Sequence, residues 1–503
     1  MKKFFKQVSK ILSWGLSVSL VLTMSGCKKN EDSDSSLGNA TKKDYDIFIY
    51  NSNANIGSAF RKMCDEYTAK TGVIIRTVTP SDDENTFDNL KEYLGGEYPP
   101  DIFTVSNMQD LEVLKENSQV WDFNNATEGS FKEAIKNIPE NLRLSSNTTD
   151  NFGVPYNIEG FGMLVDPKML ASLVGGDKYR LLLNDLKECS YEEFSEFVNA
   201  LNLYIDSESL SEVTLNNNSY TFVSEKREMS KNLDGVFTFS AGIPKYTGSY
   251  LMNIPLAAIF ASAANANISN ELQINKFKDI FMKFSEALEN ITLSMAGGSG
   301  PLARGTELVS NTQNSVSQSM KNFVNGKALF LLASTEDYNN LSMFDLSVAK
   351  RSVFIPIKMP ILAENVSSSD YIARNLNRSI TTYVPNYFCI NANSAGKEKR
   401  AAQEFLAWFQ TSEIAKKYIV SEFELTPYDA KESGIIDNAF SRSLIEYMAE
   451  GRVLPPVYQG TPGGWCDLVG KYFIEQFYTK ASWSYEDREK IAAYLMMKWK
   501  ELQ

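Results

Sequence analysis

The 503-residue chain contains no histidine. This absence excludes Ser-His-Asp and Cys-His nucleophiles, the HExxH zinc helix and every imidazole metal ligand. The body of the chain has no cluster of lysine and arginine, and 50 basic against 62 acidic residues give a formal charge of −12. Nucleic acid is therefore not an expected partner. We expect neither a cofactor nor a metal ion.

Cysteine is scarce, with five residues in the chain. Four of them lie far apart inside apolar, periodic stretches and form no CxxC pair: Cys64, Cys189, Cys389 and Cys466. A zinc site or a redox dithiol needs closely spaced cysteines. These four residues are predicted to be buried free thiols.

The chain also lacks an apolar run long enough to span a bilayer, which takes about 20 residues. Residues 1–10 carry four lysines and no acid, and residues 11–26 are apolar or small. This pattern predicts an export signal. Met24, Ser25 and Gly26 precede Cys27, which resembles the bacterial lipoprotein cleavage box and implies that Cys27 receives a diacylglycerol. An uncleaved signal anchor is the alternative, because Met24 stands where such boxes prefer leucine.

Residues 27–43 are predicted to be a lipidated flexible tether, because residues 28–43 hold only one large apolar side chain, Leu37. Sixteen flexible residues reach roughly 20–25 Å. Loss of the four signal lysines leaves 46 basic and 62 acidic residues, a balance of −16. An anionic membrane repels such a body, so the lipid would hold it on the extracytoplasmic face of the cell membrane.

From residue 44 the chain alternates between strands and helices. Predicted strands at residues 46–50, 73–78 and 102–105 are separated by helices that end at Gly72 and at Gly95. This order favours a parallel α/β sheet. Open parallel sheets bind ligands beyond the carboxyl ends of their strands. The residues at those ends are candidate ligand-binding residues, with ordinary loop composition as the alternative: Asn51, Ser52, Asn53, Ser106 and Asn107.

The ordered set of segments IFIYNSNANIGSAFRKMCDEYTAKTGVIIRTV, GGEYPPDIFTVSN and VPYNIEGFGMLVDPKML resembles the first lobe and hinge of family 1 extracellular solute-binding lipoproteins, the maltose-binding-protein type. SYEEFSEFVNAL, NGKALFLLAS and GGWCDLVGKYFIEQF continue the resemblance. It implies an α/β, two-lobe, periplasmic-binding-protein-like fold of type II with hinge crossovers. Residues 206–244 and 359–378 have no clear counterpart.

The resemblance and the element pattern together divide the chain into six parts. Ser190 and Glu193 form a capping box that begins a helix, and residues 155–162 break the periodicity where a hinge must bend. The parts are a signal (1–26), a tether (27–43), lobe 1 (44–155), hinge and lobe 2 (156–379), a return into lobe 1 (380–428) and a C-terminal helical segment on lobe 2 (429–503).

The resemblance also implies ligand-binding residues in the hinge and near the C-terminus. Tyr156, Asn157 and Glu159 lie in the hinge, where relatives present a carboxylate to sugar hydroxyl groups. A solvated segment is the alternative. Trp465 begins a helix where relatives place an aromatic ring against a sugar, and a place in the core is the alternative.

A loop after the strand at residues 328–332 carries Glu336, Asp337 and Tyr338, where maltose-type relatives have a stacking tryptophan. Glu336 and Tyr338 replace that tryptophan and are candidate ligand-binding residues. This acidic loop argues against maltodextrin and permits a more polar sugar, or an amine-bearing ligand paired with Glu336 or Asp337.

The resemblance implies a monomeric, non-catalytic receptor. It would close two lobes over a small solute, such as a sugar or oligosaccharide, and deliver the solute to the permease subunits of an ABC importer. The alternative is a surface hydrolase, such as a glycosidase, that uses a carboxylate pair and needs no histidine. No spacing in the sequence identifies such a pair.

The anchor at Cys27 can be tested directly. We expect Cys27→Ser to release the protein from membranes or to leave the precursor uncleaved, because serine offers no thiol for lipid attachment. Membrane fractionation and intact-mass measurement check this outcome. A variant that stays on the membrane with the mass of the processed wild type would contradict the anchor.

Overall fold

The computed structural model describes residues 44–81, 85–176, 178–207, 210–225, 229–297, 308–309, 315–430 and 436–503. The chain divides into two units, Met1–Asp44 and Tyr45–Gln503, and every element described below belongs to the second. The predicted signal, Cys27 and the tether lie outside the described residues. None of the described helices is both long and apolar enough to cross a membrane.

The first sheet has five strands in the order β2-β1-β3-β12-β4. The predicted parallel core is confirmed, because β1 (Ile47–Tyr50) pairs in parallel with β2 (Ile75–Val78) and with β3 (Ile102–Val105). β12 (Tyr387–Ile390) runs antiparallel to β3 and to β4 (Val154–Pro155). A distant segment therefore completes this sheet, which defines lobe 1.

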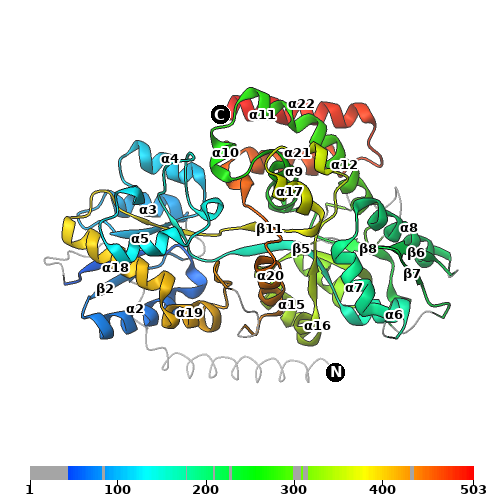
Figure 1. The fold of residues 1–503 in the computed structure, drawn as a ribbon, viewed down its shortest axis with the longest axis horizontal. Helices are drawn as coiled ribbons and strands as arrows, with labels where there is room; N and C mark the ends of the chain where they lie inside the picture. Colours follow the sequence, from blue (N-terminus) through cyan, green and yellow to red (C-terminus); the bar gives the residue numbers. More distant parts are fainter. Residues whose placement is uncertain are drawn as a thin grey trace, which may run out of the picture. The chain divides into compact units, whose positions relative to one another are not determined.

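Helices of lobe 1 surround this sheet (Figure 1). α2 (Gly57–Thr71) ends where the sequence predicts, at Gly72, whose φ of 78° suits glycine. The other helices and helical turns of lobe 1 are η1 (Ala54–Ile56), α3 (Thr86–Leu94), α4 (Met108–Glu116), η2 (Phe123–Asn125), α5 (Gly129–Lys136), η3 (Glu140–Leu142), α18 (Gly396–Thr411), α19 (Glu413–Lys417) and η10 (Tyr418–Glu422).

β5 (Glu159–Val165) is a fully buried strand in the second sheet, which defines lobe 2. It pairs antiparallel with β9 (Ala328–Ser334), with β11 (Ile380–Tyr383) along its first residues and with β10 (Val353–Ile355) along its last. Two further strands extend the sheet in parallel, β8 (Gly235–Thr238) beside β9 and β13 (Val453–Leu454) beside β11.

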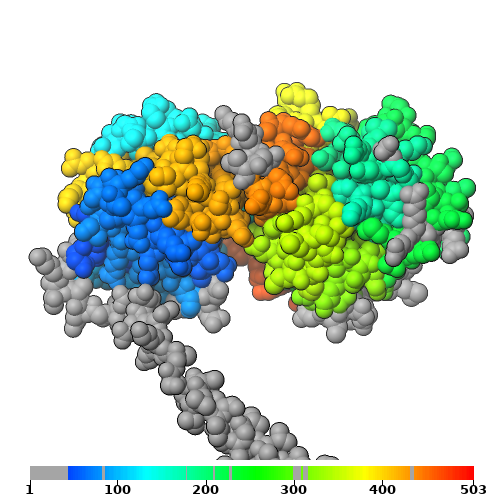
Figure 2. Space-filling view, turned by 90° about the horizontal axis from the view of Figure 1, so that it is seen from below, coloured from blue at the N-terminus to red at the C-terminus, as the bar shows by residue number. Residues whose placement is uncertain are grey.

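The chain passes between the two sheets at several places. β4 leads into β5 within the 155–162 segment that the sequence predicted to bend, and β11 leads back into β12 through residues 384–386. Another passage runs from η10 of lobe 1 to α20 (Ala439–Ala449), which packs on β5 and β10. In Figure 2 the orange residues of α20 lie between the gold residues of α18 and the green residues of lobe 2.

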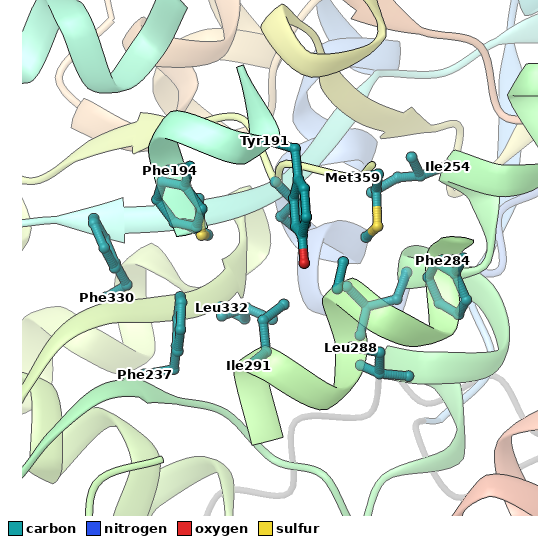
Figure 3. Close-up of a cluster of buried hydrophobic side chains, with 14 of the residues drawn as sticks. Tyr191, Phe194, Phe237, Ile254, Phe284, Leu288, Ile291, Phe330, Leu332 and Met359 are labelled. Atoms are coloured by element: carbon teal, nitrogen blue, oxygen red, sulfur yellow. The ribbon is translucent and has the colours of Figure 1, made fainter. Parts of the chain in front are cut away.

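Aromatic side chains fill the core on one face of the second sheet (Figure 3). Tyr191 and Phe194 of α8 (Tyr191–Ser207) lie above Phe237 and Phe330, whose rings stack 5.7 Å apart. The predicted capping box is confirmed, since Ser190 N donates to Glu193 Oε2 at 2.9 Å and Glu193 N donates to Ser190 Oγ at 3.2 Å. The cap therefore fixes where the helix over this core begins.

The C-terminal helices α21 (Trp465–Gln476) and α22 (Tyr485–Leu502) pack with α12 (Phe277–Leu293) on lobe 2. Other elements of lobe 2 are α6 (Pro167–Val174), α7 (Lys178–Glu188), η4 (Ser230–Asn232), η5 (Tyr246–Leu251), α9 (Asn253–Ile259), α10 (Ala263–Asn267), α11 (Glu271–Asn275), α14 (Val316–Val324), η7 (Thr335–Asp337), α15 (Tyr338–Phe344), α16 (Leu346–Arg351), η8 (Ala363–Asn365), η9 (Leu376–Arg378) and η12 (Val457–Gly460).

The two segments without a counterpart in the resemblance add structure to lobe 2. Residues 206–244 contain the hairpin of β6 (Glu212–Leu215) and β7 (Asn218–Thr221), as well as β8. Residues 359–378 contain α17 (Asp370–Asn375). The four cysteines of the described chain are free, as predicted; three are buried, and Cys466 is partly exposed.

Candidate functional site

A cavity of about 440 Å³ opens between lobe 1 and lobe 2. Lobe 1 and the β11–β12 passage contribute Ser106, Asn107, Gln109, Val384 and Pro385. Lobe 2 contributes Lys245, Ser249, Glu336, Tyr383, Tyr458, Gln459, Thr461, Pro462, Gly463, Gly464, Cys466 and Asp467. The volume and the mixture of rings and polar groups suit a small-molecule site.

The carboxyl end of β3 supplies the lobe 1 wall of this cavity, as the sequence predicted. Ser106 follows the strand, and Asn107 caps α4 by accepting a hydrogen bond from Asp110 N at 2.8 Å. The cap holds the Asn107 side chain at the start of the helix. Both predicted residues therefore line the cavity.

Tyrosine rings form the lobe 2 wall. The ring of Tyr383 stacks on that of Tyr250, with centroids 4.7 Å apart and an interplanar angle of 24°. Tyr458 meets Tyr250 edge to face at 6.2 Å. The ammonium of Lys245 lies 5.0 Å from the Tyr250 centroid and 5.6 Å from that of Tyr383. Tyr383 and Tyr458 line the cavity, while Tyr250 supports them from the core.

Glu336 joins this tyrosine wall from the loop after β9. Its Oε2 accepts a hydrogen bond from the Tyr383 hydroxyl at 2.7 Å, and its side chain lines the cavity. Burial raises the pKa of Tyr383 well above its usual value, so its hydroxyl keeps the proton that it donates. Glu336, a predicted ligand-binding residue, therefore lines the cavity and is held there by its hydrogen bond with Tyr383.

Glu159 lies behind this wall and does not line the cavity. Its side chain is buried and accepts hydrogen bonds from Asn157 Nδ2 at 2.5 Å and from Thr335 Oγ1. Burial raises the pKa of Glu159 to about 8, and the charge of Glu336 adds to the increase. The hydrogen bonds from Thr335 and Asn157 oppose it. Glu159 and Asn157 therefore support the loop that carries Glu336.

The cluster at the end of β1 connects lobe 1 to the β11–β12 passage. Ser52 Oγ donates to Asn386 Oδ1 at 3.0 Å, and Asn51 Oδ1 accepts from Asn53 N at 3.2 Å. Asn51 is fully buried. These three predicted residues do not line the cavity, and Ser52 connects their cluster to the crossing segment.

Three predicted aromatic residues lie in the core instead of the site. Tyr156 packs 4.7 Å from the ring of Phe388, and Tyr338 packs edge to face on Phe440. Trp465 begins α21 as predicted, but its indole is fully buried, and Nε1 donates to Leu495 O at 2.9 Å. The ligand-stacking interpretation of Trp465 is therefore corrected to the core alternative, because its ring points into the helices of lobe 2.

The residues that join the lobes beside the cavity were not predicted from the sequence. Gln459 Nε2 donates to Ser106 O at 3.2 Å and to Val384 O at 2.8 Å, while Oε1 accepts from Val384 N at 3.2 Å. The aromatic and proline run at residues 383–388 was the available signal for Tyr383. Nothing local marks Gln459, since its partners are distant in sequence.

Residues 62–427 match the bacterial extracellular solute-binding protein family. The chain therefore belongs to this family, and its two sheets form the corresponding two-lobe α/β fold. A comparison with curated protein sequences gives no significant match.

Solved structures share the fold over most of the chain. The bacterial solute receptor AcbH, described as exclusively preferring β-D-galactopyranose, has a TM-score of 0.57 at 12% identity and covers 90% of this chain and 97% of its own. A family 1 extracellular solute-binding protein from Bifidobacterium longum subsp. infantis has a TM-score of 0.57 at 16% identity. The alignment covers 91% of this chain and 99% of that protein. A chitin oligosaccharide binding protein has a TM-score of 0.55 at 14% identity. The alignment covers 91% of this chain and 98% of that protein.

The raised pKa of Glu159 predicts a pH-dependent stability. Between about pH 4.5 and 8 the folded chain retains a proton that the unfolded chain releases, so the free energy of unfolding falls as pH rises. Glu159→Gln cannot titrate and preserves the hydrogen-bonding shape. Its melting temperature relative to wild type should therefore rise between about pH 5 and pH 8. Over the same range the free energy of unfolding of wild type should fall, relative to that of the variant, by on the order of a few kcal/mol.

Thermal melts across this pH range measure the difference. The exposed carboxylate variant Glu364→Gln is the control and should follow the wild-type profile. A constant difference between Glu159→Gln and wild type at every pH would contradict a carboxyl that is protonated by burial.

Proposed function

We propose that this chain is a receptor that captures a sugar or oligosaccharide between its lobes and delivers it to the permease subunits of an ABC importer. The cavity formed by both lobes is the observation that carries the proposal. Tyr458 offers its ring to the apolar side of a sugar, with the buried ring of Tyr383 lining the cavity beside it, and Ser106, Asn107 and Glu336 offer hydrogen-bonding groups.

The ligands of structurally similar proteins support a carbohydrate. AcbH is described as a β-D-galactopyranose receptor, and another neighbour as a chitin oligosaccharide binding protein. The cavity volume of about 440 Å³ lies within the range of about 300–1,000 Å³ that small-molecule pockets occupy.

Attachment by lipid at Cys27 is part of the proposal. Family membership supports an extracellular location. The sequence supports the anchor through the residues before Cys27 and the polar segment that follows it. The Cys27→Ser variant described above tests this part separately from solute binding.

Solute capture requires only a shift between open and closed lobes. A solute that touches Asn107 of lobe 1 and Tyr458 of lobe 2 gains its full set of contacts only when the lobes are closed, so binding favours closure. We do not propose the hydrolase alternative. Of the carboxylates that line the cavity, Glu336 binds Tyr383, and Asp467 is paired with Lys471 at 2.5 Å.

A thermal-shift screen over monosaccharides and oligosaccharides tests the proposed function. A ligand at about 100 times its dissociation constant adds roughly 2.7 kcal/mol to native stability. Tyr458→Ala should weaken binding of the stabilising sugar by at least about tenfold, because the cavity loses a ring face.

Tyr485→Ala is the matched control, since Tyr485 is 67% exposed on α22. Calorimetry should give it the wild-type affinity. Equal affinities for wild type and Tyr458→Ala would place the solute elsewhere. Recovery of a cleaved sugar after incubation would overturn the receptor in favour of a hydrolase.

A further inference from the structure

A positively charged group already lies against the tyrosine wall of the cavity. The Lys245 ammonium sits within 6 Å of the Tyr250 and Tyr383 centroids, the range of a cation–π contact. In the parts of the chain that the structure describes, no carboxylate lies within 4.0 Å of this nitrogen. The ammonium therefore contacts the rings without a direct ion pair, and its charge opposes the increase in the pKa of the buried Asp337 carboxyl, for which burial is the largest cause.

The same corner of the cavity is acidic. Glu336 lines it, and its charge raises the pKa of both Glu159 and Asp337, for which burial is the largest cause. Glu336 Oε2 accepts from Tyr383, which leaves the carboxylate available to a second donor. Asp467 also lines the cavity, and its carboxylate pairs with the Lys471 ammonium at 2.5 Å.

We propose that the solute carries an ammonium group, which binds the Glu336 carboxylate beside the Tyr383 ring and displaces the Lys245 ammonium from that ring. This inference rests on the proposed function and specifies its ligand class as an amino sugar or an oligosaccharide with a free amine. An anionic sugar meets repulsion from Glu336 and is rejected.

Two physical terms favour such a ligand. A charge-assisted hydrogen bond to a carboxylate is about twice as strong as a neutral one. The face of Tyr383 adds cation–π attraction, which grows when water is excluded from a closed site. N-acetylation of the same sugar removes its charge and therefore removes both terms.

The test compares matched sugars by calorimetry near pH 6, where the amine of a sugar is largely protonated. The probes are the β-1,4-linked disaccharide and trisaccharide of glucosamine and their fully N-acetylated counterparts. Wild type should bind the free amines at least about tenfold more tightly than the acetylated sugars. Glu336→Gln should weaken amine binding by about ten- to a hundredfold and should abolish the preference for the free amines over the acetylated sugars.

Two further variants sharpen the test. Glu364→Gln removes an exposed carboxylate outside the cavity and should bind as wild type does. Lys245→Met keeps the apolar stem and removes the internal ammonium, so amine binding should become severalfold tighter. Weaker amine binding by Lys245→Met would overturn the assignment of Lys245 as the group that the solute displaces.

The remaining outcomes separate this inference from the proposed function. Equal or tighter binding of the acetylated sugars would overturn the ammonium site and leave a sugar receptor. Binding of a simple diamine such as putrescine, with no binding of any saccharide, would support the ammonium site and overturn the sugar receptor. Binding of none of these probes would count against both.

Discussion

The pairing of β5 on both sides is the constraint on which the site depends. A buried strand must hydrogen-bond its backbone groups, so β5 fixes the register of its neighbours. Tyr383 of β11 lies opposite Glu159, and Ser334 of β9 lies opposite Phe161. The loop after β9 then brings Glu336 to the Tyr383 hydroxyl. Through this register Glu336 and Tyr383, 47 residues apart in sequence, meet at the cavity.

Sequence reasoning reached the features that local chemistry determines. The glycine at position 72 ends α2, Ser190 caps α8, and Ser106 and Asn107 follow a parallel strand into the cavity. Glu336 was named through the family resemblance, which draws attention to the loop after the strand at residues 328–332. Each of the other features depends on residues close together in the chain, where propensity and capping act.

The rest could not be predicted because it depends on packing between distant segments. Trp465 begins a helix in a glycine-rich turn, which is as compatible with a core as with a ligand, and only the position of α22 decides that its indole is covered. Likewise, the contact of Lys245 with Tyr383 requires the fold of lobe 2. Such contacts have no signature in a single sequence.

Closure of the lobes over a solute is the central claim, and small-angle X-ray scattering tests it most directly. The radius of gyration of the chain should fall when the saccharide that stabilises it is added to saturation, because contacts from both lobes form only in the closed state. Tyr458→Ala at the same sugar concentration should keep the larger radius. An identical radius for the wild-type chain with and without saturating sugar would contradict the account.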